Sequence, residues 1–181
     1  FEHAPRRVRE MSRRVPPVPV QPADRGRAED GAAGRGPVFL ENLDGALLSR
    51  LRMLPGSAFS ALPDLSEGLE NRLLKAVGAG RSFPEICAAA KTKRYTLARL
   101  RRLLLCAALG VRAADTRGVP PYIRVLAFGE GGREILRAAR KSASLPVIMR
   151  AADVSGLNRR GRRIYALECA ATDLYSLAFS P

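Results

Sequence analysis

Residues 38–109 carry apolar side chains at the spacing of an α-helix, and prolines and glycines break this pattern into short segments. In "VFLENLDGALLSRLRML" (38–54), leucines recur three or four residues apart and line one helical face. Pro55 and Gly56 then end the segment. The same spacing returns in three further segments, at 67–80, 83–91 and 93–109. The pattern therefore predicts a domain built from short helices.

A hydroxyl residue stands before each of these three further segments, and a glycine follows the last one. The side chains of Ser66, Ser82 and Thr92 can each accept a hydrogen bond from an unpaired N–H group of the following turn. Gly110 is of the residue type that most often ends a helix. We therefore expect helices to begin after these hydroxyl residues, the last of them near Lys93.

The apolar pattern changes in the second half of the chain. "YIRVLAF" (122–128) and "LPVIMR" (145–150) are rich in β-branched or aromatic residues, which is typical of strands. "REILRAARKSA" (133–143), between them, predicts a helix. The side chains expected to face inward from it are Ile135, Leu136 and Ala139. A strand–helix–strand unit of this kind is right-handed with parallel strands, and two strands alone need further support.

The fold class predicted is therefore mainly α. It is a helical domain with one small βαβ unit, of two short parallel strands, packed on the helices. A last helix is expected in residues 163–179. Residues 15–37 are rich in proline, glycine and charge without an apolar period, and they predict a flexible linker before the helical domain of residues 38–181.

The chain is strongly basic, and its charge is concentrated in one part of the sequence. The formal net charge is +14 at pH 7, and only four of the 31 basic residues are lysines. Residues 81–114 carry eight basic side chains against one acidic one, and no acid occurs from Ile86 to Ala114. A focused excess of arginine favours a binding face for a polyanion such as nucleic acid.

Histidine and cysteine usage excludes several kinds of site. The single histidine, His3, leaves no material for a hydrolase triad or a histidine-rich metal site, so we predict no catalytic residue and no metal site here. Cys87, Cys106 and Cys169 lack CxxC spacing and are expected to be reduced thiols in a cytoplasmic protein. No apolar run is long enough to span a bilayer, so no membrane partner is expected.

The basic stretch "KTKRYTLARLRR" (91–102) is the main candidate for a binding surface. Cations at a helix start are disfavoured by the helix dipole unless an anion is bound there. An RNA backbone would supply that anion, and Tyr95 could stack on an unpaired base. The residues predicted to contact RNA are Lys91, Lys93, Arg94, Tyr95, Arg99, Arg101 and Arg102. The alternative is a solvated charged face on a packed helix, although no nearby acid pairs these side chains.

Two other polar segments have more than one interpretation. "GEGGR" (129–133) lies between a predicted strand and a predicted helix, but it matches neither common phosphate-loop pattern and is expected to be a simple turn. "NRRGRR" (158–163) is expected to be a basic loop. In that loop, Arg159 and Arg160 either contact phosphate or are simply solvated.

Five segments of the sequence, taken in order, resemble one enzyme family. They are "SEGLENRLLKA", "KTKRYTLARLRRLLL", "PPYIRVLAFGEGGREIL", "SLPVIMR" and "ATDLYSL". Together they resemble the C-terminal region of the bacterial tRNA(Met) cytidine acetate ligases, which are also classed as nucleotidyltransferase-like. The resemblance runs from about Val38 to the end of the chain.

The resemblance implies a two-step, ATP-dependent tRNA modification. Such enzymes use ATP, with Mg²⁺ expected, to activate acetate as acetyl-adenylate. They then acetylate N4 of the wobble cytidine of elongator tRNA(Met). An N-terminal nucleotidyltransferase domain with an HxGH-type signature does the adenylation, and the helical C-terminal region helps to hold tRNA. On this basis the chain alone is expected to be inactive and to bind no cofactor by itself.

The start of the chain departs from the family pattern. With one histidine, the sequence cannot contain HxGH. Because it begins with Phe1 rather than Met, we expect a fragment or a processed chain. The resemblance implies that residues 1–14 are the remnant of the nucleotidyltransferase domain. It also implies that Arg9 is the arginine that contacts the nucleotide, although the flanking "HAP" does not match the family.

Two other functions fit the same sequence. The chain could be a stand-alone RNA-binding module without chemistry, which predicts the same RNA contacts. It could also be a protein-interaction domain whose arginines reflect codon usage, which predicts tRNA binding no tighter than heparin binding.

Overall fold

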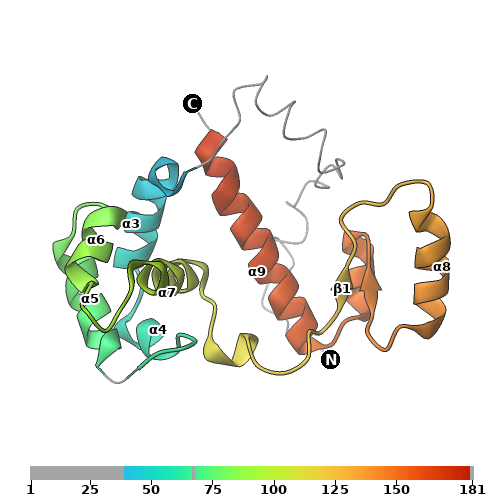
Figure 1. The fold of residues 1–181 in the computed structure, drawn as a ribbon, viewed down its shortest axis with the longest axis horizontal. Helices are drawn as coiled ribbons and strands as arrows, with labels where there is room; N and C mark the ends of the chain where they lie inside the picture. Colours follow the sequence, from blue (N-terminus) through green and yellow to red (C-terminus); the bar gives the residue numbers. More distant parts are fainter. Residues whose placement is uncertain (1–38, 67, 180–181) are drawn as a thin grey trace, which may run out of the picture. The chain divides into compact units, whose positions relative to one another are not determined.

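The structure is a computed structural model that describes residues 39–66 and 68–179 (Figure 1). The predictions for residues 1–14, for the linker at 15–37 and for Arg9 lie outside these residues. The described chain divides into two compact units. The helical unit comprises residues 39–119 and 163–179, and the small unit comprises residues 120–162.

The helical unit is an assembly of short helices, as the leucine spacing predicts. Four helices, α3, α5, α6 and α7, form its centre: α3 contacts α5, α6 and α7, and α6 contacts α5 and α7. The unit's elements in chain order are η1 (Leu40–Leu43), α3 (Asp44–Arg52), α4 (Gly56–Ser60), α5 (Leu69–Ala79), α6 (Phe83–Ala90), α7 (Leu97–Leu109), η2 (Ala113–Asp115), the greater part of α9 (Arg159–Ser176) and η4 (Leu177–Phe179).

The apolar stripes expected from the sequence form a large part of the core of the helical unit. Leu47 and Leu51 of α3, Leu73 of α5, and Leu100 and Leu104 of α7 are at most 1% exposed. Burying a leucine side chain stabilises a fold by about 1.5–3 kcal/mol. These stripes therefore hold the helices together and leave the charged residues of each helix outside.

The ends of the helices agree with the sequence at some positions and differ at others. Ser82 is confirmed as a cap, since its Oγ accepts a hydrogen bond from Glu85 N at 3.2 Å. Gly110 is confirmed as the end of α7, where it adopts a left-handed φ of 76°. Ser66 does not cap α5. That helix begins after Gly68, whose left-handed φ of 76° lets the chain turn into it.

The small unit contains the predicted strand–helix–strand motif in a reduced form. β1 (Ile123–Arg124) and β2 (Val147–Ile148) pair in parallel, with Ile123 opposite Val147. Each strand is two residues long, shorter than the runs of 122–128 and 145–150 predict. α8 (Gly132–Ser142) connects them, and η3 (Ala151–Gly156) and the first turn of α9 complete the unit.

α8 differs from the prediction in what it covers. None of its residues is buried, and the side chain of Ile135, expected to face inward, is 69% exposed. The prediction is wrong for Ile135, because the two-residue strands offer only a narrow sheet surface, whereas Leu136 and Ala139, the other two residues expected to face inward, are half-buried. Within residues 39–66 and 68–179, no helix is long and apolar enough to cross a membrane.

Candidate nucleic-acid interface

The basic stretch 91–102 begins as a loop rather than as a helix. Thr92 Oγ1 accepts hydrogen bonds from the backbone N atoms of Arg94 and Tyr95, both at 3.2 Å, which closes a turn. α7 begins four residues later than expected, at Leu97, and Thr96 is its cap. Lys91, Lys93 and Arg94 therefore lie on the connection between α6 and α7, and not in the first turn of α7.

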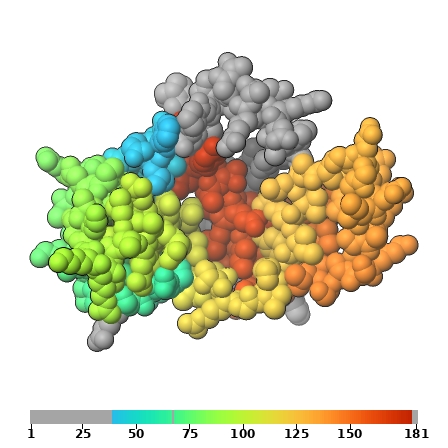
Figure 2. Space-filling view, viewed as in Figure 1, coloured from blue at the N-terminus to red at the C-terminus, as the bar shows by residue number. Residues whose placement is uncertain are grey.

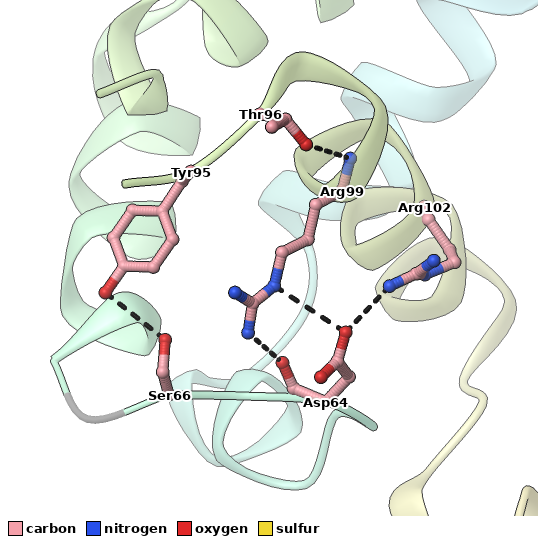
Figure 3. Close-up of polar contacts among 6 residues, drawn as sticks. All are labelled: Asp64, Ser66, Tyr95, Thr96, Arg99 and Arg102. Carbon is pink, nitrogen blue, oxygen red and sulfur yellow. Dashed lines mark hydrogen bonds and ion pairs between the residues drawn. The ribbon is translucent and has the colours of Figure 1, made fainter. Parts of the chain in front are cut away.

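Tyr95 is part of the core. Its side chain is 6% exposed, and Ser66 Oγ donates a hydrogen bond to its hydroxyl at 3.2 Å (Figure 3). The guanidinium carbons of Arg94 and Arg99 lie 5.7 Å and 5.6 Å from the ring centroid, which is the range of cation–π contacts. The prediction that Tyr95 stacks on an RNA base is therefore wrong, because the ring cannot reach a base without leaving the core.

Asp64 supplies the acidic partner that the local sequence lacks. It precedes α5 and lies 38 residues before Arg102, whose Nη2 donates to Asp64 Oδ2 at 2.7 Å (Figure 3). Arg99 Nη2 donates to the Asp64 carbonyl at 2.7 Å, and Arg99 Nε lies 3.6 Å from the carboxylate. No acidic residue is near these arginines in the sequence, but the fold brings Asp64 to them. Arg99 is thus a packing residue, and Arg102 is partly neutralised.

The remaining cations of the stretch are free to bind an anion. Lys91, Lys93, Arg94 and Arg101 are exposed, and no hydrogen bond or ion pair with another residue of the described chain occupies their charged groups. These four residues and Arg102, which pairs with Asp64, form what we call the 91–102 basic surface. They come from the end of α6, the loop and the outer face of α7.

Arg101 lies close to α6, where its charge acts on a buried thiol. Burial raises the pKa of Cys87, and the positive charge of Arg101 opposes that rise without cancelling it. Burial likewise raises the pKa of Cys106. All three cysteines are free thiols, with Cys87 and Cys169 buried and Cys106 half-buried. The expectation of reduced thiols is confirmed, and the direction of the pKa shifts makes Cys87 and Cys106 poor nucleophiles.

The segment "NRRGRR" is the start of α9 and not a loop. Asn158 Oδ1 accepts a hydrogen bond from Gly161 N at 2.8 Å, which caps the helix. Arg159 is exposed and Arg160 is half-buried in the first turn. The prediction of a basic loop is therefore wrong, and asparagine immediately before the arginines was the signal for a helix start.

The last arginine of that segment has a structural role in the helical unit. Arg163 Nε and Nη2 donate to the two carboxylate oxygens of Asp115, at 2.7 Å and 2.8 Å. Nη2 also donates to the carbonyl of Gly110 at 3.0 Å, at the end of α7. These hydrogen bonds hold the pKa of Asp115 below its usual value and raise the pKa of Arg163. Arg163 therefore uses its Nε and Nη2 donors within the helical unit, and only its Nη1 donors lie outside these bonds.

Comparison with known proteins assigns the chain to a family. The family model described as HIGH Nucleotidyl Transferase matches residues 10–181. The chain belongs to this family. It is 31% identical over 176 residues to the tRNA(Met) cytidine acetate ligase of Alkaliphilus metalliredigens, a match that covers 94% of this chain and 41% of the relative. It is 42% identical over 120 residues to the enzyme of the same name from Thermotoga maritima, covering 64% of this chain and 28% of the relative.

Two solved structures share the fold of this chain. The apo crystal structure of Thermotoga maritima TmcAL superposes with a TM-score of 0.76 at 33% identity, covering 88% of this chain and 41% of that one. The same protein bound with alpha-thio ATP gives a TM-score of 0.75 at 33% identity. The chain spans about two fifths of the length of the first of these relatives.

The sequence differs from the family pattern implied by the resemblance in its histidine content. Its one histidine, His3, cannot form the two-histidine HxGH signature that the resemblance implies. Within the described residues, no group of three or more His, Cys, Asp or Glu side chains could hold a metal ion. The described part of the chain offers a basic surface on a packed scaffold.

Proposed function

We propose that this chain is the tRNA-holding, C-terminal part of an ATP-dependent tRNA(Met) cytidine acetate ligase. The observation that carries the proposal is the 91–102 basic surface, whose exposed cations have no acidic partner in the described chain apart from Asp64. It lies on a well-packed helical unit in a chain related to enzymes named for tRNA(Met). The proposal places the protein in the cytoplasm, where tRNA is modified.

The complete reaction needs ATP, which this chain is not expected to bind by itself. Acetate attacks the α-phosphate of ATP, which is expected to be bound with Mg²⁺, and forms acetyl-adenylate as pyrophosphate leaves. The N4 amine of the wobble cytidine of elongator tRNA(Met) then attacks the acetyl carbonyl, loses a proton and releases AMP. We assign both steps to a nucleotidyltransferase domain outside this chain. Arg9 remains the proposed contact of this chain with the nucleotide.

The role of this chain in that reaction is to bind and orient the RNA. Lysine and arginine contacts to phosphate oxygens supply affinity and fix the position of the RNA, but they carry no sequence information. Selection of the wobble cytidine therefore lies with base contacts elsewhere. Arg159, exposed in the first turn of α9, and Arg160 beside it are further proposed phosphate contacts.

The proposal is tested by tRNA binding and by turnover with the chain as it stands. We expect elongator tRNA(Met) to bind more tightly than heparin of equal charge, and we expect no consumption of ATP in the presence of acetate and Mg²⁺. Binding no tighter than to heparin would favour a protein-interaction domain. Turnover of ATP and acetate by the chain alone would contradict the division of labour. Equal affinity for all RNAs, with no effect on acetylation when added to an adenylating domain, would favour a stand-alone RNA-binding module.

A further inference from the structure

We propose that α8 and Phe128 form a second RNA-contacting surface on the small unit. In this proposal, Arg133, Arg137 and Lys141 contact phosphates, and the ring of Phe128 stacks on an unpaired base. The proposal rests on the proposed function, because it concerns the same RNA. It was not expected from the sequence, which indicated a helix facing inward onto the strands and a simple turn before it.

The three cations lie in one row along the helix. They are spaced four residues apart, so they project from the same face of α8. All three are exposed, and within the described residues none of them makes a hydrogen bond or an ion pair. Glu134 lies on the same helix but pairs with none of them. The row thus forms a continuous positive strip about two turns long.

The row is the outer face of α8. No residue of α8 is fully buried, and the half-buried ones, Gly132, Leu136 and Ala139, lie on the face opposite the row. Like charges four residues apart on a helix repel each other and destabilise it. A bound polyanion would remove that cost, because each phosphate lies between neighbouring cations. Figure 2 shows the α8 side chains, in orange, at the outer surface of the small unit.

Phe128 adds an aromatic face at the N-terminal end of α8. Its side chain is 47% exposed and lies against the first turn of α8, since a β-carbon added at Gly132 would come 2.7 Å from Phe128 Cβ. The turn between them is closed by a hydrogen bond from Gly132 N to the Gly129 carbonyl at 3.0 Å. Proteins that bind single-stranded RNA commonly combine exposed aromatic rings with basic side chains.

The charge of the whole small unit favours RNA over the other polyanions. Residues 120–162 contain nine basic and three acidic side chains, so the unit is strongly positive for its size. Ile135 is the one large apolar side chain of α8 that is exposed. A helix that lies on a membrane needs a broad apolar face, which a single isoleucine does not provide. We therefore assign the row to an RNA backbone.

The test compares two matched charge reversals in the whole chain. Arg133→Glu with Arg137→Glu alters the row, and Arg72→Glu with Lys75→Glu alters exposed residues of α5 by the same net charge. Loss of two phosphate contacts lowers tRNA affinity about tenfold to thirtyfold near 0.15 M salt and reduces the log–log salt slope by roughly 1.4–1.8. We expect this for the α8 pair and a much smaller change for the α5 pair. Circular dichroism checks that both variants fold.

Phe128→Ala, with Phe128→Leu as the control for lost apolar volume, tests the ring. Loss of one stacked base lowers affinity by about fivefold or more for an RNA with unpaired bases, but leaves affinity for a blunt-ended RNA duplex unchanged. We expect Phe128→Leu to behave like Phe128→Ala, because both lack an aromatic face. Equal losses on both RNAs, or none on either, would overturn the role of Phe128.

The outcomes separate this proposal from the proposed function. If the unaltered chain does not bind tRNA, the proposed function fails. If it binds, and Lys93→Glu with Arg94→Glu weakens it while the α8 pair does not differ from the α5 pair, only the α8 surface fails. If the α8 pair lost binding to phosphatidylserine vesicles but still bound tRNA like the unaltered chain, the RNA-contacting role of α8 would be overturned in favour of a membrane surface.

Discussion

Arg163 donates two parallel hydrogen bonds, at 2.7 Å and 2.8 Å, to the carboxylate of Asp115, whose side chain is 7% exposed. The pair ties α9 to the end of α7 in the helical unit, together with the bond from Arg163 to the Gly110 carbonyl. We expect Arg163→Met, which keeps the apolar stem, to lower the free energy of unfolding by about 1–2 kcal/mol, after allowing for the partial exposure of Arg163. Urea denaturation measures it. An unchanged midpoint would show that the pair contributes nothing.

The same pair predicts a pH dependence of stability. Because the pKa of Asp115 is lower in the folded state than its ordinary value of 3.8, the pair's contribution is fully present above that value. It is lost as pH falls through the lower, folded-state pKa. The difference in unfolding free energy between the unaltered chain and Asp115→Asn should therefore be constant from about pH 5 to 7 and should shrink below about pH 4. A difference that grows toward acid pH would contradict the direction of the shift.

Asp64 restrains the basic surface, and its removal should strengthen RNA binding. Asp64→Asn removes the charge that pairs with Arg102 but keeps a residue type that tolerates the left-handed φ of 55° at this position. We expect tRNA affinity to rise about twofold to fivefold at low salt and this gain to disappear at high salt. Fluorescence anisotropy titrations at two salt concentrations measure it. Weaker binding would mean that Asp64 orients Arg102 for the RNA.

Tyr95 should matter for stability and not for RNA binding. Tyr95→Phe removes only the hydroxyl that accepts from Ser66, so we expect a loss of about 0.5–1.5 kcal/mol in unfolding free energy. Its tRNA affinity should equal that of the unaltered chain. A variant of normal stability with weakened tRNA binding would restore the base-stacking role that the structure removes.

Local signals in the sequence predicted the helices of the helical unit well. The leucines of α3 and α7 and the ends at Ser82 and Gly110 follow from spacing and from residue type, both of which act within one or two turns. The start of α7 was missed because Thr92 and Thr96 are equally good caps. What separates them is the burial of Tyr95, which depends on its contact with Ser66, 29 residues away.

The candidate site depended on contacts that spacing cannot predict. The pairing of Arg102 with Asp64 joins residues 38 positions apart, and the pairing of Arg163 with Asp115 joins residues 48 apart. Both arginines looked free in the sequence because only the folded chain brings the acids to them. The exposure of Ile135 on α8 was missed for the opposite reason, since an amphipathic pattern implies a broad covering surface and the two-residue strands provide only a narrow one.

The central claim is that the 91–102 basic surface holds tRNA, and one comparison tests it most directly. The affinity for elongator tRNA(Met) is measured over a range of salt concentrations for the unaltered chain, for Lys93→Glu with Arg94→Glu, and for Arg72→Glu with Lys75→Glu. The account predicts that the first pair lowers affinity about tenfold to thirtyfold and reduces the salt slope by roughly 1.4–1.8, while the α5 pair has little effect. Equal effects of the two pairs, in variants that fold normally by circular dichroism, would contradict it.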